Sequence, residues 1–178
     1  MKGYLVLLLA ALLLLNLATC PAEAEGREIL LVIRYVGSWE YSDDAVVLLS
    51  SGERLHFDLR GLPQEVLGDR QNLLAFLRHH GTSSDPGLYP VPQPDSLEPL
   101  GEDFALRVRG LLDVIRDTPF ETRFHAFDAG GFDLYGVIQV DGEARLTLIS
   151  ESGTFVGQSP DPAAQALIEL VGPRLLLD

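Results

Sequence analysis

The sequence predicts an α+β fold in which a mostly antiparallel sheet of about six or seven strands packs against three amphipathic helices. Two observations carry this prediction. Short apolar segments with strand-like patterning recur along the chain, and several are joined by glycine-containing turns typical of hairpins. Three longer segments repeat apolar residues every three or four positions, which is the spacing of a helix with one buried face. Residues 25–178 are long enough to form a single domain with its own core.

The N-terminal 24 residues are predicted to be a secretion signal that precedes this domain. Lys2 is followed by an uncharged segment, residues 3–22, whose centre is rich in leucine. A basic start, about a dozen apolar residues and a small-residue cleavage motif are the features of a signal peptide. The motif here is Ala-Glu-Ala at residues 22–24, and cleavage after Ala24 would leave residues 25–178.

Two alternatives to this cleavage remain open. Residues 17–20, Leu-Ala-Thr-Cys, resemble a bacterial lipobox, in which Cys20 would be acylated and become the new N-terminus. The leader would otherwise stay as an anchor, because 20 uncharged residues are long enough to span a hydrocarbon core of about 30 Å. Each outcome places the domain in the periplasm, outside the cell, or on the outer side of a membrane. We expect membrane contact only through the leader or a lipid on Cys20.

The charge of the chain limits its partners. The formal net charge is −13 at pH 7, and Lys2 is the only lysine. Such acidity argues against a nucleic-acid partner, because phosphates would be repelled, whereas it suits cationic partners, divalent ions or simple solubility. Cys20 is the only cysteine, so residues 25–178 contain no disulfide and must rely on their core.

The first strands are indicated by apolar runs near the start of the domain. Residues 29–36 are almost uniformly apolar and rich in β-branched side chains, which predicts a central strand buried on both faces. A hairpin follows, with strands at 45–49 and 54–59 joined through a turn at Gly52. The second of these strands alternates apolar and polar residues, which predicts one buried and one solvent-facing side.

The first helix is predicted from Arg70 to His80. Asp69 precedes it as an N-cap and Gly81 follows it as a terminator. Its inner stripe is expected to consist of leucines at helical spacing, namely Leu73, Leu74 and Leu77.

A proline-rich segment at 82–99 separates the first helix from the second. Its five prolines exclude a helix and a central strand, so we expect an irregular extended segment. The second helix is predicted at 101–117, where apolar residues recur every 3.6 positions, and Thr118-Pro119 ends it.

The last third is predicted to be rich in strands, at 122–127, 132–140, 145–149 and 154–158. The dipeptide Asp141-Gly142 between the second and third of these is a strong hairpin signal.

The third helix is predicted to start after Ser159. This serine is the expected N-cap, and a proline occupies the first helical turn. Gly172-Pro173 are expected to end the helix.

The histidines do not form a recognisable catalytic or metal motif. Adjacent residues on a helix point about 100° apart, so His79 and His80 cannot easily bind one ion. We predict capping and surface roles for all four histidines, which are His56, His79, His80 and His125. The sequence also contains no nucleophile elbow, P-loop or dinucleotide-binding motif, and we predict no cofactor.

Two acidic segments are weak candidates for binding sites. Asp128 and Asp133 flank a glycine turn and offer oxygen ligands that suit Ca²⁺, although the ladder of a calcium loop is missing and a plain turn is favoured. Trp39 and Tyr41 lie beside two carboxylates, Asp43 and Asp44. Because Trp and Tyr are enriched in binding hot spots, this loop is the best candidate contact surface. A core role for Trp39 is the competing interpretation.

These observations favour a non-enzymatic envelope or secreted binding domain with a protein or glycan partner. One alternative is a hydrolase with an Asp/Glu/His site, for example around His125 and Asp128. Another is an extracytoplasmic module stabilised by Ca²⁺. No motif is specific enough to name a reaction.

Overall fold

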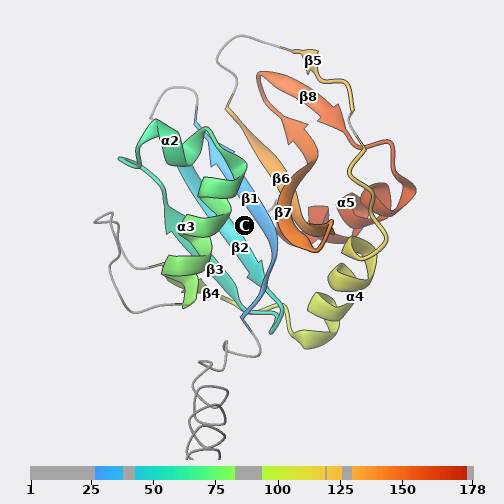
Figure 1. Cartoon of the computed structure of the whole chain (residues 1–178), viewed down its shortest axis with the longest axis horizontal. Helices are drawn as coiled ribbons and strands as arrows, with labels where there is room; N and C mark the ends of the chain where they lie inside the picture. Colours follow the sequence, from blue (N-terminus) through green and yellow to red (C-terminus); the bar gives the residue numbers. More distant parts are fainter. Residues whose placement is uncertain (1–26, 38–42, 83–93, 119, 126–129, 176–178) are drawn as a thin grey trace, which may run out of the picture.

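The computed structural model describes residues 27–37, 43–82, 94–118, 120–125 and 130–175, and in this part of the chain it is an α+β fold (Figure 1). The described strands form one antiparallel sheet and are β1 (Ile29–Val36), β2 (Asp43–Leu49), β3 (Arg54–Asp58), β4 (Asp95–Leu97), β5 (Arg123–Phe124), β6 (Gly131–Val140), β7 (Glu143–Ser152) and β8 (Phe155–Gln158). The described helices are α2 (Gln64–Leu67), α3 (Arg70–Thr82), α4 (Glu102–Leu112) and α5 (Pro162–Leu175).

The sheet has the strand order β4-β3-β2-β1-β6-β7-β8-β5, and all neighbouring strands are antiparallel. β1 lies between β2 and β6, which confirms that residues 29–36 form a central strand. The sheet has eight strands, somewhat more than predicted. One strand that the sequence did not indicate is β4, inside the segment expected to be irregular. Its three residues lie between Pro94 and Pro99 and contain no proline themselves, so they pair with β3 at the edge of the sheet.

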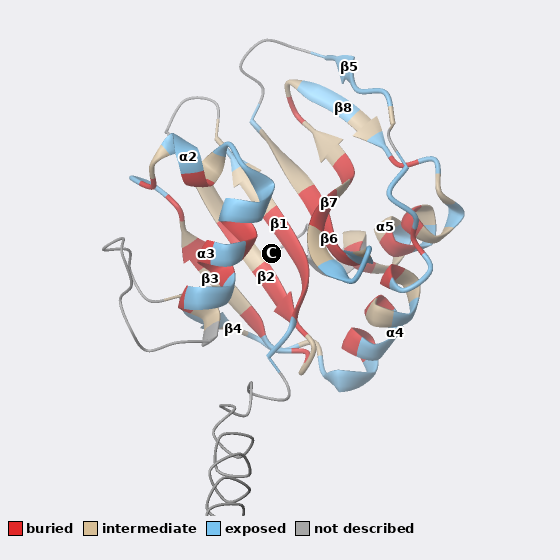
Figure 2. Ribbon diagram, in the orientation of Figure 1, coloured by how far each residue is buried: buried red, intermediate tan, exposed pale blue. Residues whose placement is uncertain are grey.

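Helices cover both faces of the sheet (Figure 1). On the first face, α2 and α3 bury one apolar cluster that includes Val32, Phe57 and Leu77. On the second face, α4 and α5 bury another that includes Ile33, Val108 and Leu167. β1 contributes to both clusters because its side chains are apolar on either side, and it is buried along most of its length (Figure 2).

The hairpin of β6 and β7 contains a tight turn and, further along, a β-bulge. Asp141 and Gly142 adopt positive φ angles of 54° and 82°, as the predicted two-residue turn requires. Further along, the register shifts, because Leu134 faces Ser150 whereas Tyr135 faces Leu148. Ile149 is therefore an extra residue in β7, a β-bulge. Before the bulge, even-numbered residues of β7 such as Leu146 face the first side of the sheet. Beyond the bulge, odd-numbered residues face that side, so Glu151 lies on the first face.

The predicted start of α3 is confirmed. The Asp69 carboxylate accepts hydrogen bonds from the backbone N–H groups of Gln71 and Asn72, both at 2.9 Å. The helix ends one residue beyond the expected terminator, at Thr82. Gly81 packs near the side chains of Leu55 and Phe57 in β3.

The second helix is shorter than predicted. α4 ends at Leu112, and the chain continues in a turn in which the backbone N–H of Val114 donates to the Leu111 carbonyl at 3.2 Å, the three-residue spacing of a tighter turn. Ile115 remains buried after the helix has ended, which explains why the apolar pattern extended further than the helix.

The cap and the end of the third helix were wrongly predicted. Asp161, not Ser159, accepts the N-terminal hydrogen bonds of α5, from the N–H of Ala163 at 2.8 Å and of Ala164 at 3.4 Å. Ser159 instead accepts a bond from the Asp161 N–H. The helix also continues through Gly172-Pro173 to Leu175. A proline so close to the C-terminus removes only one hydrogen bond, and the buried upstream face holds the helix in place.

Two further expectations on strands need correction. Residues 126 and 127 of the strand predicted at 122–127 lie outside the described residues, and within 122–125 only the two residues of β5 form a strand, which pairs with β8. In β3, Arg54 was expected to face solvent but is buried, and its Nε donates to the Glu98 carbonyl at 2.7 Å. Glu98 directly follows β4, the strand that the prediction lacked.

Candidate functional site

A row of three charged residues crosses the middle of the sheet on its first face. Arg34 of β1 lies directly opposite Asp133 of β6, and Asp133 lies directly opposite Glu151 of β7. Residues directly opposite each other have Cβ atoms about 5 Å apart. Charged side chains are rarely placed at the centre of a sheet, so this row is the first indication of a site.

Arg34 is held in place by partners on either side. Its Nε and Nη2 bind the two carboxylate oxygens of Asp43 at 2.8 and 2.5 Å, and its Nη1 donates to the Leu67 carbonyl at 2.9 Å. The two charged side chains are only 16% and 17% exposed. Arg34 thereby joins β1, the start of β2 and the end of α2. The bond to Asp43 also raises the pKa of Arg34, so its charge is permanent.

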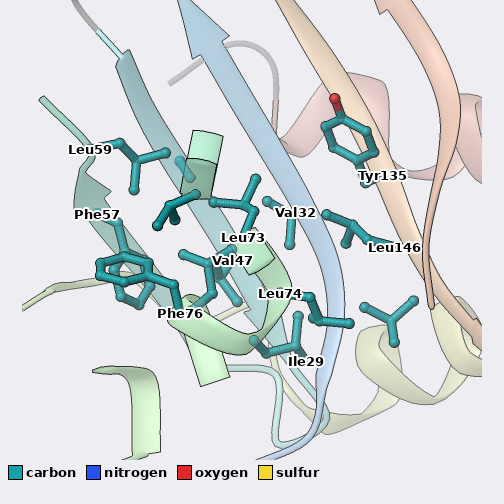
Figure 3. Packing of buried hydrophobic residues seen from close by; sticks show 14 of the residues in the cluster. Ile29, Val32, Val47, Phe57, Leu59, Leu73, Leu74, Phe76, Tyr135 and Leu146 are labelled. Atoms are coloured by element: carbon teal, nitrogen blue, oxygen red, sulfur yellow. The ribbon is translucent and has the colours of Figure 1, made fainter. Parts of the chain in front are cut away.

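Tyr135 lies beside this row on β6. Its hydroxyl donates to Asp133 Oδ2 at 2.9 Å, and the guanidinium of Arg70 lies 5.6 Å from the centre of its ring. In Figure 3 the Tyr135 ring extends the apolar cluster, and its oxygen points away from Leu146 and the other labelled side chains. Tyr135 therefore marks the border between the core and a polar region.

An open pocket of about 680 Å³ adjoins the polar region at the edge of β7. Among the described residues, β7 pairs with β8 only through Ser150 and Glu151, and no other described strand lies beside that edge of β7. Three acidic residues line the pocket, namely Asp117, Asp133 and Glu151. The segment that follows α4, together with β8, adds aromatic side chains, among them Phe120 and Phe155.

Burial shapes the electrostatics of this pocket. It raises the pKa of Asp133 above the usual range, although the hydrogen bond from Tyr135 and the charge of Arg34 oppose the shift. The pKa of Glu151 is also raised, first by burial and then by the negative charge of Asp133. Burial and the Asp133 charge likewise raise the pKa of Tyr135, so its hydroxyl stays protonated as a donor. Both carboxyl groups thus favour a proton or another positive charge nearby.

The acidic pair proposed from the sequence as part of a contact loop is divided by the sheet. Asp43 and Asp44 belong to β2, where successive side chains point to opposite faces. Asp43 pairs with Arg34 on the first face, whereas Asp44 lies 3.4 Å from His56 Nε2 on the second. Trp39 and Tyr41, the aromatic part of the same candidate, lie outside the described residues.

The candidate calcium ligands also separate. Asp133 is part of β6 and faces the pocket, whereas Asp128 lies outside the described residues, as does Cys20. In the parts of the chain that the structure describes, no three His, Cys, Asp or Glu side chains converge as metal ligands would. His125 is exposed at the end of β5, with its backbone N–H bound to the Thr154 carbonyl at 2.9 Å.

One histidine departs from the surface roles predicted for all four. His80 is buried, and its ring centre is 4.4 Å from that of Phe76 one turn earlier in α3. The ring replaces an apolar side chain at the inner face of the last helical turn.

The sequence analysis did not predict this pocket, although two residues in or beside it gave a signal. Arg34, which adjoins Asp133, is a charged residue inside an otherwise apolar strand. Tyr135 lies two positions after Asp133, so the two side chains were expected on the same face of a strand. Glu151 gave no such signal, because the bulge at Ile149 reverses the alternation that would have placed it.

The comparisons with known proteins add no family. No family model, curated protein or solved structure matches the chain. Within the described residues, no helix has both the length and the apolar character needed to cross a membrane.

Proposed function

We propose that the protein is an exported, non-enzymatic binding domain whose ligand site is the pocket at the edge of β7. The single observation that carries this proposal is the arrangement of Asp133 and Glu151, two neighbouring carboxyl groups that line an open pocket together with aromatic rings. A concave surface with a few convergent polar groups of shifted pKa is typical of a ligand site. The leader at residues 1–24 supports export.

The lining supports binding more than catalysis. An acid–base pair works best when its environment pushes the two pKa values apart, whereas burial here raises both carboxyl pKa values in the same direction. The described lining offers carboxyl, hydroxyl, guanidinium and aromatic groups, but no histidine, serine or cysteine. Such groups orient and hold a ligand well.

A hydrolase is the second candidate function, and the same carboxyl groups favour it. A carboxyl group with a raised pKa can serve as a general acid, and Asp133 and Glu151 are neighbours in one pocket. In this alternative the reacting groups would be these two, rather than the His125 and Asp128 suggested by the sequence. A protein or glycan partner at the loop with Trp39 and Tyr41 also stays a prediction.

The experiment is a fragment screen followed by NMR. Purified protein is titrated with small fragments of varied charge, and the amide shifts of each hit are mapped on the chain. We expect hits to cluster at residues lining the pocket, such as Thr122, Leu148 and Glu151. Hits that cluster instead around His56, on the other face, would overturn the assignment, as would a screen without hits.

Assays with esterase, glycosidase and peptidase substrates separate the two candidates. Turnover that is lost in both Asp133→Asn and Glu151→Gln would replace the binding proposal with the hydrolase. Absence of turnover, together with pocket-directed hits, supports binding.

A further inference from the structure

We infer that the pocket recognises a small organic cation, an ammonium or guanidinium group attached to an apolar body. This inference rests on the proposed function and specifies its ligand. The charges and the aromatic rings that line the pocket support it.

The pocket has an excess of negative charge. Asp117, Asp133 and Glu151 line it, and Arg70 is the cation among the described lining residues. Arg34 stands next to Asp133 in the sheet, but its donors are directed to Asp43 and to the Leu67 carbonyl. The pocket therefore holds more acidic than basic groups even when Arg34 contributes its long-range field.

The two central carboxyl groups have room for a positive partner. In the described part of the chain, neither Asp133 nor Glu151 has an oppositely charged side chain within 4 Å. Asp133 accepts one hydrogen bond, from Tyr135. A carboxylate has about four acceptor positions, so most of the acceptor capacity of the pair is available to a ligand that donates. An ammonium group has three donors and no acceptor, and it fits such a site.

The aromatic side chains in the pocket lining suit the apolar part of the ligand. The ring of Phe120 packs closely on Gly157 of β8, where a Cβ atom would lie only 2.7 Å from it. Phe155 is 45% exposed, and its ring meets that of Phe124 in an edge-to-face contact with centres 6.2 Å apart. Exposed aromatic rings attract both apolar groups and cations. The guanidinium of Arg70 lies in such a position over the Tyr135 ring.

The alternatives in ligand charge fit less well. An anion would approach three carboxylates with one guanidinium to offset them, and the net charge of −13 would repel it further. A neutral ligand would leave the negative charges of the desolvated pair uncompensated. A cation offsets the burial that raises the pKa of both groups.

The test compares three ligands of one shape at pH 7. Phenethylamine carries the positive charge, 2-phenylethanol is its neutral counterpart, and phenylacetate carries a negative charge. NMR titration of the purified protein is expected to give at least tenfold tighter binding of the amine than of the alcohol, and no binding of the acid. Asp133→Asn and Glu151→Gln should each weaken the amine about tenfold and leave the alcohol unchanged. Phe155→Ala should weaken both.

Asp44→Asn serves as the control, because it removes a carboxylate from the other face and should change nothing. Equal binding of the three ligands within the pocket would overturn the inference about charge and leave the proposed site intact. Amine binding that is unaffected in Asp133→Asn, Glu151→Gln and Phe155→Ala would overturn the site as well. Tighter binding of a capped lysine peptide than of phenethylamine would overturn the assignment to a small molecule.

Discussion

Asp133 and Glu151 stand directly opposite each other in the antiparallel pair of β6 and β7, on a face of the sheet that is partly covered by α3. Two like charges in directly opposed positions destabilise a sheet, and burial adds to this cost. A fold selected for stability alone would place an apolar or oppositely charged pair here. Such a cost in stability is expected if these residues form the proposed binding site, because binding and active sites commonly carry it.

The first prediction concerns the pH dependence of stability in Asp133→Asn. Because the pKa of Asp133 is higher in the folded state than in the unfolded state, folding takes up a proton over the pH range just above the usual carboxyl value of about 4. The free energy of unfolding then falls as pH rises through that range. The variant lacks this proton, so its stability relative to wild type should increase between pH 4 and pH 7 in denaturant titrations.

Asp58→Asn is the matched control with the opposite sign. A hydrogen bond from Arg60 lowers the pKa of Asp58 to about 2. The stability that this pair contributes is present above pH 4 and is lost as pH falls toward 2. The variant should therefore differ from wild type at neutral pH and approach it in acid. A pH profile of Asp133→Asn with this same shape would contradict the burial of Asp133.

The second prediction concerns the ion pair of Arg34 and Asp43. Arg34→Met removes two bonds to the carboxylate and the bond to the Leu67 carbonyl, and it leaves a buried charge uncompensated. We expect a loss of about 2–4 kcal/mol in the free energy of unfolding. In the double variant with Asp43→Asn, part of this loss should be recovered, because no uncompensated charge remains.

Arg145→Met tests whether burial is the reason. Arg145 pairs with Glu143 at 3.5 Å in a more exposed position, and its loss should cost less than about 1 kcal/mol. Equal effects of the two arginine substitutions would show that burial of the Arg34 pair contributes nothing.

Local sequence signals were sufficient for much of the fold. β1 is apolar on both faces, and only a central strand with helices on either side buries such a segment. Asp141-Gly142 fixed a hairpin because few other residues adopt two successive positive φ angles. Asp69 indicated the start of α3 because its carboxylate satisfies two free N–H groups of the first turn.

The pocket could not be predicted from the sequence, because it depends on features that leave no local sequence pattern. Glu151 reaches the first face through a bulge, and one extra residue in a strand leaves no periodic signal. Arg70 is an exposed first residue of a helix, and only the packing of α3 on the sheet brings it to Tyr135. The partner of Asp43 was equally hidden, since Arg34 is adjacent only after β1 and β2 have paired.

The third prediction compares two glycines that share a backbone conformation. Gly52 and Gly61 have φ angles of 83° and 85°, so alanine at either position should cost about 1–2 kcal/mol in strain. A side chain at Gly61 would meet open space, whereas one at Gly52 would lie 2.3 Å from the Gly101 carbonyl oxygen. Thermal or denaturant unfolding should show an additional loss of about 2 kcal/mol for Gly52→Ala. Equal losses would mean that the contact between the β2–β3 turn and the start of α4 is loose.

The last prediction concerns the predicted leader, because anchoring would decide which ligands the proposed site can meet. Cys20→Ser would block acylation and leave unchanged the apolar segment that we predict to direct export, so cleavage after Ala24 should continue. We expect wild-type protein expressed with its leader to begin at Glu25 and to enter the aqueous phase of a detergent partition. Wild type in the detergent phase with the variant in water would show a lipid anchor instead. Both proteins in detergent would show a retained leader. A domain on a lipid would work within a few tens of ångströms of the membrane, because Pro21 to Gly26 form only a short tether. A released domain would instead meet cations that diffuse freely.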